Sequence, residues 1–414
     1  MKPFLLLLAL AVVLSFAMAR AANAKASPGE PVPLSSTRSI GDVIADAQGR
    51  PVHIVYVHGM RAEGPGAVKP FVERLGREIG HSGSLDRTQR RRVELGAWPS
   101  TATVGSSLIW RSEAAWNASA PFVDRYVLKG AGGETVILDE VNWWPLLFPL
   151  KCHFLLLPER IVSGADKAHL RLCARRDDPY YPWISETDLV EALSSRPLSG
   201  GAARINRALK REIMNWGLSD AVITLGPMRM YVRESLNQAF SLAAQQQHGL
   251  AEPEYIVISE SLGSFAVLDA FESNEPSVKA VLDRTHNLYF LANQFALLDL
   301  GRVEGLPSAI SSGGMLAPAA PPPDGAPALS GLKRWATGDG LAIASGTLRQ
   351  VIAFSDPSDV LTYRVPDIEG ATVSNVYVRN TPRWFGLFAD PAKAHAGHVA
   401  NPRVMRIMLD KRSN

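Results

Sequence analysis

The stretch Tyr255-Ile-Val-Ile-Ser-Glu-Ser-Leu-Gly-Ser264 decides the fold. It opens with four apolar residues, which predict a buried strand. The residues that follow, Phe265-Ala-Val-Leu-Asp-Ala-Phe271, predict a helix. Strand and helix are joined by a Ser-x-Ser-x-Gly segment, in which Ser259 and Gly263 are small enough to let the two elements approach closely around Ser261.

Other predicted elements extend this pattern in both directions along the chain. Runs typical of strands alternate with segments whose apolar residues recur at helical spacing. Such alternation favours an α/β fold, with a mostly parallel central sheet and helices on both faces. The expected strands are 53–57, 92–98, 287–291, 350–354 and 374–378, with a hairpin of 124–129 and 134–141, and the expected helices include 67–79, 229–246 and 402–409.

The predicted organisation is a single large domain, 46–410, preceded by a Pro-, Ser- and Ala-rich exposed arm at 25–45. Residues 101–218 lack the strand–helix rhythm after their hairpin and are interpreted as a lid-like insertion, a hairpin plus a helical lid. Its Trp143-Trp144 cluster fits either an apolar ligand site or the core of the insertion. Residues 304–331, with three consecutive prolines, are expected to form a flexible surface loop.

The N-terminus has the pattern of a secretory signal peptide. Lys2 precedes the apolar run 4–16, and the small-residue sites Ala17-Met-Ala19 and Ala22-Asn-Ala24 follow it. The sequence therefore predicts that residues 1–24 are removed and that the mature protein is secreted or periplasmic. If the leader is not cleaved, it would instead anchor the protein to a membrane.

Composition excludes several classes of protein. The 33 Gly and 29 Pro make up about 15% of the 414 residues, too little for a low-complexity chain. The net charge of only +3 gives no indication of nucleic-acid binding. Cys152 and Cys173 are the only cysteines, and an even number in an exported protein favours a disulfide between them, although two free thiols remain the alternative.

The strand–turn–helix around Ser261 resembles the nucleophile elbow of the α/β-hydrolase superfamily, the family of many serine esterases and lipases. That family usually has Gly-x-Ser-x-Gly, so Ser259 departs from the pattern at the first glycine. The resemblance covers roughly residues 50–410. It implies an α/β-hydrolase fold with Ser261 as the nucleophile.

A second segment, His58-Gly59-Met60 after the strand 53–57, resembles the loop that supplies one oxyanion-hole donor in this superfamily. The resemblance implies that the backbone N–H groups of Met60 and Leu262 bind the oxyanion. His58 is then expected to orient the loop.

The superfamily order of nucleophile, acid and base selects the remaining residues. His395 opens a short loop before the Pro-started final helix, as the catalytic histidine of the superfamily often does, with His398 as the alternative base. Asp359 follows the strand 350–354 and precedes two apolar residues, which fits the acid. Asp356 is the alternative acid, or a turn former before Pro357.

Together these residues predict a serine hydrolase that cleaves carboxylic esters through an acyl-enzyme. The substrate class is a small-molecule or lipid ester, and the lid would allow contact with a membrane surface. A thioesterase or amidase would use the same residues, and a non-catalytic binding protein of the same fold is the other alternative. The sequence contains no P-loop, no dinucleotide-binding Gly pattern and no His-Glu-x-x-His motif, so no metal or cofactor is expected. It does not decide the oligomeric state.

Overall fold

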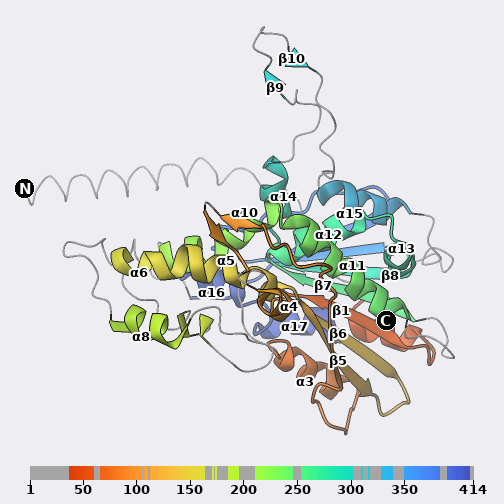
Figure 1. The fold of residues 1–414 in the computed structure, drawn as a ribbon. Helices are drawn as coiled ribbons and strands as arrows, with labels where there is room; N and C mark the ends of the chain where they lie inside the picture. The colour runs from red at the N-terminus through yellow and green to blue at the C-terminus, as the bar shows by residue number, and fades with distance from the viewer. Residues whose placement is uncertain are drawn as a thin grey trace, which may run out of the picture. The chain divides into compact units, whose positions relative to one another are not determined.

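The computed structural model describes a subset of the chain (Figure 1). The predicted signal peptide, Met60 and most of the predicted loop 304–331 lie outside it. The chain divides into two compact units, Met1–Thr37 and Arg38–Asn414, and all the elements named below belong to the second. The described residues are 37–59, 66–104, 106–110, 112–163, 170–171, 173–174, 185–194, 210–245, 253–301, 309–310, 316–317, 328–338, 349–382 and 389–410.

The centre of the second unit is an eight-stranded sheet of order β12-β11-β8-β7-β1-β6-β5-β2. Neighbours from β12 to β6 pair in parallel, whereas β5 pairs antiparallel with both β6 and β2. The expected α/β class with a mostly parallel sheet is therefore confirmed. The strands are β1 (Val52–Val57), β2 (Gln89–Arg92), β5 (Phe122–Lys129), β6 (Thr135–Asn142), β7 (Glu254–Glu260), β8 (Thr285–Leu291), β11 (Arg349–Ser355) and β12 (Ala371–Tyr377), with the short pairs β3 (Thr103–Val104)–β4 (Ser107–Leu108) and β9 (Ala309–Ile310)–β10 (Leu316–Ala317).

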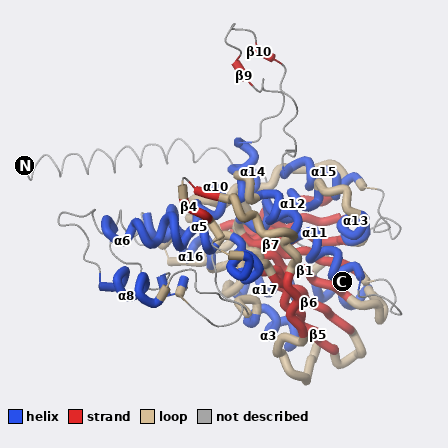
Figure 2. Tube along the Cα trace, in the orientation of Figure 1, coloured by secondary structure: helices blue, strands red, loops and turns tan. Residues whose placement is uncertain are grey.

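Helices flank this sheet, as Figure 2 shows. They are α2 (Ile40–Asp46), α3 (Lys69–Glu78), α4 (Glu113–Ala118), α5 (Phe148–Lys151), α6 (Leu157–Ser163), α8 (Glu186–Ser194), α10 (Ser219–Leu225), α11 (Arg229–Gln245), α12 (Leu262–Phe271), α13 (Pro276–Asp283), α14 (Phe295–Leu298), α15 (Ala328–Thr337), α16 (Pro391–Ala396) and α17 (Pro402–Leu409).

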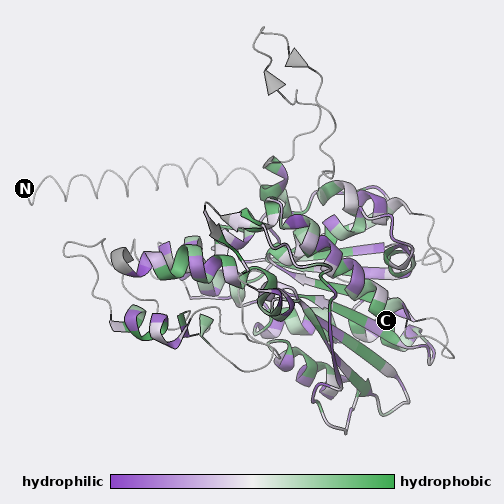
Figure 3. Ribbon diagram, in the orientation of Figure 1, coloured by the Kyte–Doolittle hydropathy of each residue, from purple (hydrophilic) through white to green (hydrophobic). Residues whose placement is uncertain are grey.

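The two faces of the sheet are covered by different helices. Along β1, Val55 and Val57 belong to a large apolar core that includes Phe240 of α11, whereas the ring of Tyr56 packs against Phe71 of α3. Successive side chains of a strand point to opposite faces, so α11 and α3 lie on opposite sides. Helices α11, α12, α13 and α15 pack together on the first side, and α17 packs with α2 and α3 on the second. In Figure 3 much of the ribbon of the central strands has the colour of hydrophobic residues.

Three expectations about local structure need correction. Residues 40–45 of the expected exposed arm belong to α2, which buries Ile40 and Val43. The strand expected at 92–98 is instead Gln89–Arg92, an edge strand placed by its pairing with β5. The hairpin expected in the lid is β5–β6, and it contributes two strands to the main sheet.

Apart from α4, the helices of the predicted insertion follow Asn142. A disulfide joins Cys152 to Cys173 there, with Cα atoms 5.9 Å apart. Both cysteines lie in a small apolar core with Trp144 and Phe148, all of them buried. These aromatic side chains consequently serve as core of this segment. Within the described residues, no helix combines the length and the apolar character needed to cross a membrane.

Candidate active site

Ser261 occupies a strained turn between β7 and α12, at the carboxyl end of the central strands. Its backbone has φ 49° and ψ −123°, a left-handed φ that non-glycine residues rarely adopt. The N–H of Ser261 donates to the carbonyl oxygen of Leu291 over 2.8 Å, and the Ser264 hydroxyl donates to the Ser261 carbonyl oxygen over 2.6 Å. These bonds hold the turn in its strained conformation.

Two glycines make this turn possible by close approach. A Cβ on Gly59 would lie 2.6 Å from the Cβ of Ser261, and a Cβ on Gly263 would lie 2.5 Å from the His58 carbonyl oxygen. Both distances are far shorter than van der Waals contact, so neither position tolerates a larger residue. Ser259, which stands where the hydrolase pattern has its first glycine, is fully buried. Among the residues that the structure describes, its hydroxyl has no hydrogen-bond partner.

Gly263→Ala is predicted to disrupt the turn, because the added methyl group would push β1 and α12 apart. We expect lower thermal stability and at least a tenfold loss of reactivity at Ser261, measured by thermal unfolding and by active-site labelling. Gly226→Ala is the matched control, since its Cβ would meet its nearest neighbour at an ordinary 3.4 Å. Equal effects of the two substitutions would contradict the prediction.

The structure brings the three expected side chains together. The Oγ of Ser261 lies 2.7 Å from Nε2 of His395, and Nδ1 of His395 lies 2.8 Å from Oδ2 of Asp359. Because Asp359 accepts a hydrogen bond from Nδ1–H of His395, Nε2 is left to accept the hydroxyl proton of Ser261. The side-chain amide of Gln294 lies 3.4 Å from the same Nε2.

Asp359 is held as an ionised acceptor. Burial alone would raise its pKa, but the hydrogen bond and charge of His395, with hydrogen bonds from the Thr362 hydroxyl and the Leu361 N–H, hold the pKa below its ordinary value. Asp356 does not take this place. Its carboxylate accepts the backbone N–H groups of Ser358 and Asn380, at 2.8 and 2.6 Å, as a turn former does.

His395 lies in the last turn of α16 rather than in the loop predicted for it. Asp390 caps this short helix by accepting two backbone N–H groups, and Pro391 is its first residue. His398 is buried, and within the described part of the chain neither of its ring nitrogens has a hydrogen-bond partner. Burial is the main reason that its pKa falls to about 4, so His398 is neutral beside Asp359 and Glu260.

One of the two expected oxyanion donors can be placed. Leu262 is the first residue of α12, and the first N–H groups of a helix have no partner within it. The N–H of Leu262, next to Ser261, therefore makes no hydrogen bond within the helix. Met60, the other expected donor, lies outside the described residues and follows Gly59 directly.

His58 belongs to a buried charged cluster behind Ser261. Its Nε2 lies 2.7 Å from Glu140 Oε1, and its Nδ1 lies 3.5 Å from Glu260 Oε2. Burial alone would lower the pKa of His58, but the hydrogen bonds and charges of the two glutamates outweigh burial and raise it to about 10. For Glu140 and Glu260, burial works toward a higher pKa, and His58 more than offsets it, so both pKa values are lowered.

This cluster predicts how stability depends on pH. A histidine whose pKa is raised by folding stabilises the protein fully below its unfolded value, about 6.5, and this contribution is lost as pH rises through the folded value of about 10. The difference in unfolding free energy between the wild type and His58→Asn should therefore shrink steadily from pH 6.5 to pH 10. Urea unfolding at several pH values measures it, and parallel curves for the two proteins would contradict the prediction.

Glu140, Glu260 and Trp143 also belong to this site, and none of them was predicted from the sequence. The indole N–H of Trp143 donates to the His58 carbonyl oxygen over 2.7 Å, and the Tyr56 hydroxyl donates to Glu260 over 2.5 Å. One signal was available: Asp139-Glu140 is a pair of acids inside an otherwise apolar strand. Charged residues in such a place are nearly always paired.

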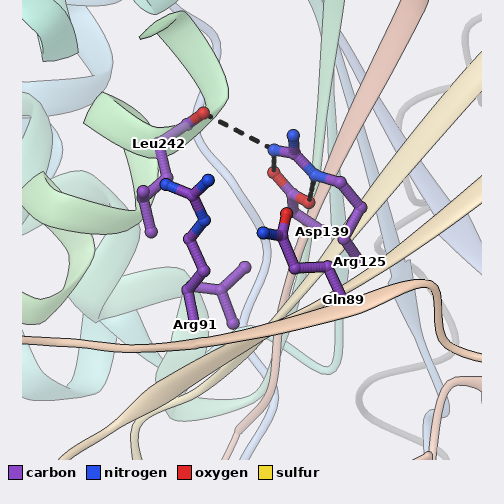
Figure 4. Close-up of a pocket in the computed structure, with 6 residues that line it drawn as sticks. Gln89, Arg91, Arg125, Asp139 and Leu242 are labelled. Carbon is purple, nitrogen blue, oxygen red and sulfur yellow. Dashed lines mark hydrogen bonds and ion pairs between the residues drawn. The ribbon is translucent and has the colours of Figure 1, made fainter. Parts of the chain in front are cut away.

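A separate shallow hollow lies on the α11 side of the sheet, among β2, β5 and β6 (Figure 4). Arg125 forms a bidentate pair with Asp139 there, at 2.6 and 2.5 Å, and Nε2 of His53 lies 2.8 Å from the same carboxylate. Asp139 and Glu140 are adjacent in β6, so they face opposite sides of the sheet, and Asp139 faces away from the His58 cluster. Among the described residues, no group of three or more His, Cys, Asp or Glu side chains is arranged to bind a metal ion.

The chain matches no protein-family model, and no curated protein is significantly similar to it.

Proposed function

We propose that this protein is a serine hydrolase of the α/β-hydrolase type that cleaves carboxylic esters. The observation that carries the proposal is the unbroken hydrogen-bond chain from Ser261 through His395 to Asp359. A nucleophile, a base and a group that orients the base, in this mutual geometry, are what acyl transfer requires. The strained elbow between β7 and α12, and the position of β1 beside β7, also support this fold type.

In the proposed reaction, Nε2 of His395 takes the hydroxyl proton while Oγ of Ser261 attacks the ester carbonyl carbon. Asp359 holds Nδ1–H, fixes the tautomer and stabilises the imidazolium that forms. The negative oxygen of the tetrahedral intermediate is bound by the N–H groups of Leu262 and Met60. His395 then gives its proton to the departing alcohol, and water, activated by the same nitrogen, releases the acid from Ser261.

The proposed setting is outside the cytoplasm. The signal-peptide pattern of residues 1–24 supports export, and the Cys152–Cys173 disulfide suits an oxidising compartment. We propose small-molecule or lipid esters as the substrate class. Hydrolysis of the ester group needs no cofactor in this mechanism.

A panel of p-nitrophenyl esters with acyl chains of 2 to about 16 carbons tests this function on the purified mature protein. The proposal expects catalytic turnover, with an initial burst of p-nitrophenol close to one equivalent if deacylation is slow. Parallel assays with thioesters and anilides separate an esterase from a thioesterase or an amidase. Tight binding of esters without turnover would instead favour the binding-protein alternative.

A further inference from the structure

Glu140 is a fully buried carboxylate two residues before the end of β6, on the face of the sheet that carries α3. It accepts hydrogen bonds from four groups. They are Nε2 of His58 at 2.7 Å, the Tyr126 hydroxyl at 3.2 Å, and the backbone N–H groups of Gly66 and Val68, each at 3.3 Å. One carboxylate therefore holds both the end of β1 and the chain that leads into α3.

The same contacts reach the nucleophile. The second ring nitrogen of His58 faces the carboxylate of Glu260, which is the residue directly before Ser261. The Trp143 indole N–H fixes the His58 carbonyl oxygen from the other side, at 2.7 Å. The next residue, Gly59, is packed so closely on Ser261 that it leaves no room for a Cβ.

We propose that Glu140 is a positioning residue for ester hydrolysis: through His58 it fixes the His58-Gly59 peptide against Ser261 and Gly263, and so holds Ser261 and the Leu262 N–H in place for the oxyanion. This inference rests on the proposed function. Glu140 touches no reacting atom, so its effect should appear in the stabilisation of the oxyanion and hardly in substrate binding.

The test compares Glu140→Gln with Asp139→Asn. Both substitutions remove a buried carboxylate that pairs with a histidine, from neighbouring positions of one strand, but only Glu140 faces the His58-Gly59 peptide. Both variants are expected to lose stability in urea unfolding. They should differ in catalysis, measured with p-nitrophenyl acetate and with its thionoester, in which sulfur replaces the carbonyl oxygen.

Oxyanion donors accelerate hydrolysis of the ester strongly. They accelerate hydrolysis of the thionoester little, because sulfur is a weak hydrogen-bond acceptor. For Glu140→Gln we expect kcat on the ester to fall by about 10²-fold, KM to change by less than about threefold, and the ester-to-thionoester rate ratio to fall by about tenfold. Asp139→Asn should keep the wild-type ratio. Trp143→Phe, which removes the hydrogen bond to the His58 carbonyl oxygen, should also lower the ester-to-thionoester ratio. It replaces Glu140→Gln as the test variant if Glu140→Gln does not fold.

An unchanged ratio in Glu140→Gln, or in Trp143→Phe if that variant must serve, would overturn the inference, as would an equal loss in Asp139→Asn. The wild-type measurement separates this from failure of the proposed function. A wild type that hydrolyses no ester and takes no fluorophosphonate would refute the hydrolase itself. An active wild type with unaltered ratios in the variants would refute only the role of Glu140.

Discussion

Replacing Ser261 by alanine is expected to lower kcat for ester hydrolysis by a factor on the order of 10⁶, the effect of removing the nucleophile of a triad. The Ser261 hydroxyl is the group that bonds to Nε2 of His395, and Ser261 stands at the turn between β7 and α12, directly before the first residue of α12. No other hydroxyl group is bonded to that nitrogen among the described residues. The measurement is the initial rate of p-nitrophenyl acetate hydrolysis.

Ser84→Ala is the control for this substitution, because Ser84 lies on an exposed loop and its hydroxyl bonds to nearby Asp86. It should leave the rate unchanged. Equal rates for Ser261→Ala and the wild type would show that the ester is cleaved elsewhere or by a contaminant, and the assignment of Ser261 would be wrong.

Asp359→Asn is expected to lower kcat by about 10⁴-fold while the protein stays folded. The amide has nearly the shape of the carboxylate, but its N–H group would favour the wrong tautomer of His395, and it no longer stabilises the imidazolium. Because the carboxylate also accepts from Thr362 and Leu361, a modest loss of stability should accompany the loss of rate. Steady-state kinetics and thermal unfolding measure the two effects separately.

Asp356→Asn is the matched comparison, since Asp356 is a buried carboxylate three residues away. It accepts backbone N–H groups in a turn and is not bonded to His395. Its rate should fall less than about tenfold, with a loss of stability. A larger kinetic loss in Asp356→Asn than in Asp359→Asn would make Asp356 the acid and contradict the geometry.

Local signals in the sequence were sufficient to predict most strands and helices around the candidate site. The apolar run before Ser259, the helix after Ser261 and the polar residues that follow each strand are short-range patterns, and the strands around the site form close to their expected bounds. The helix that carries His395 also had a local signal, Asp390-Pro391, a capping residue followed by a proline at the first helical position. Its six residues are too few to show an apolar periodicity.

Long-range pairing was not accessible in the same way. The strand at 89–92 is polar, and its bounds follow from its ladder with β5 rather than from its own composition. The sequence pattern of the hairpin β5–β6 is the same whether the hairpin covers a site or extends the main sheet. Only the pairing of β6 with β1 decides between these two arrangements. Glu140 meets His58 across 82 residues, a contact that no local pattern of the chain specifies.

The central claim, that Ser261 is an activated nucleophile, is tested most directly by treating the folded mature protein with a fluorophosphonate probe and locating the adduct by mass spectrometry. We predict one probe per chain, bound to Ser261, with no adduct in Ser261→Ala and a strongly slowed reaction in His395→Ala. Absence of labelling in both buffer and detergent, or labelling at another residue with Ser261 unmodified, would contradict the account.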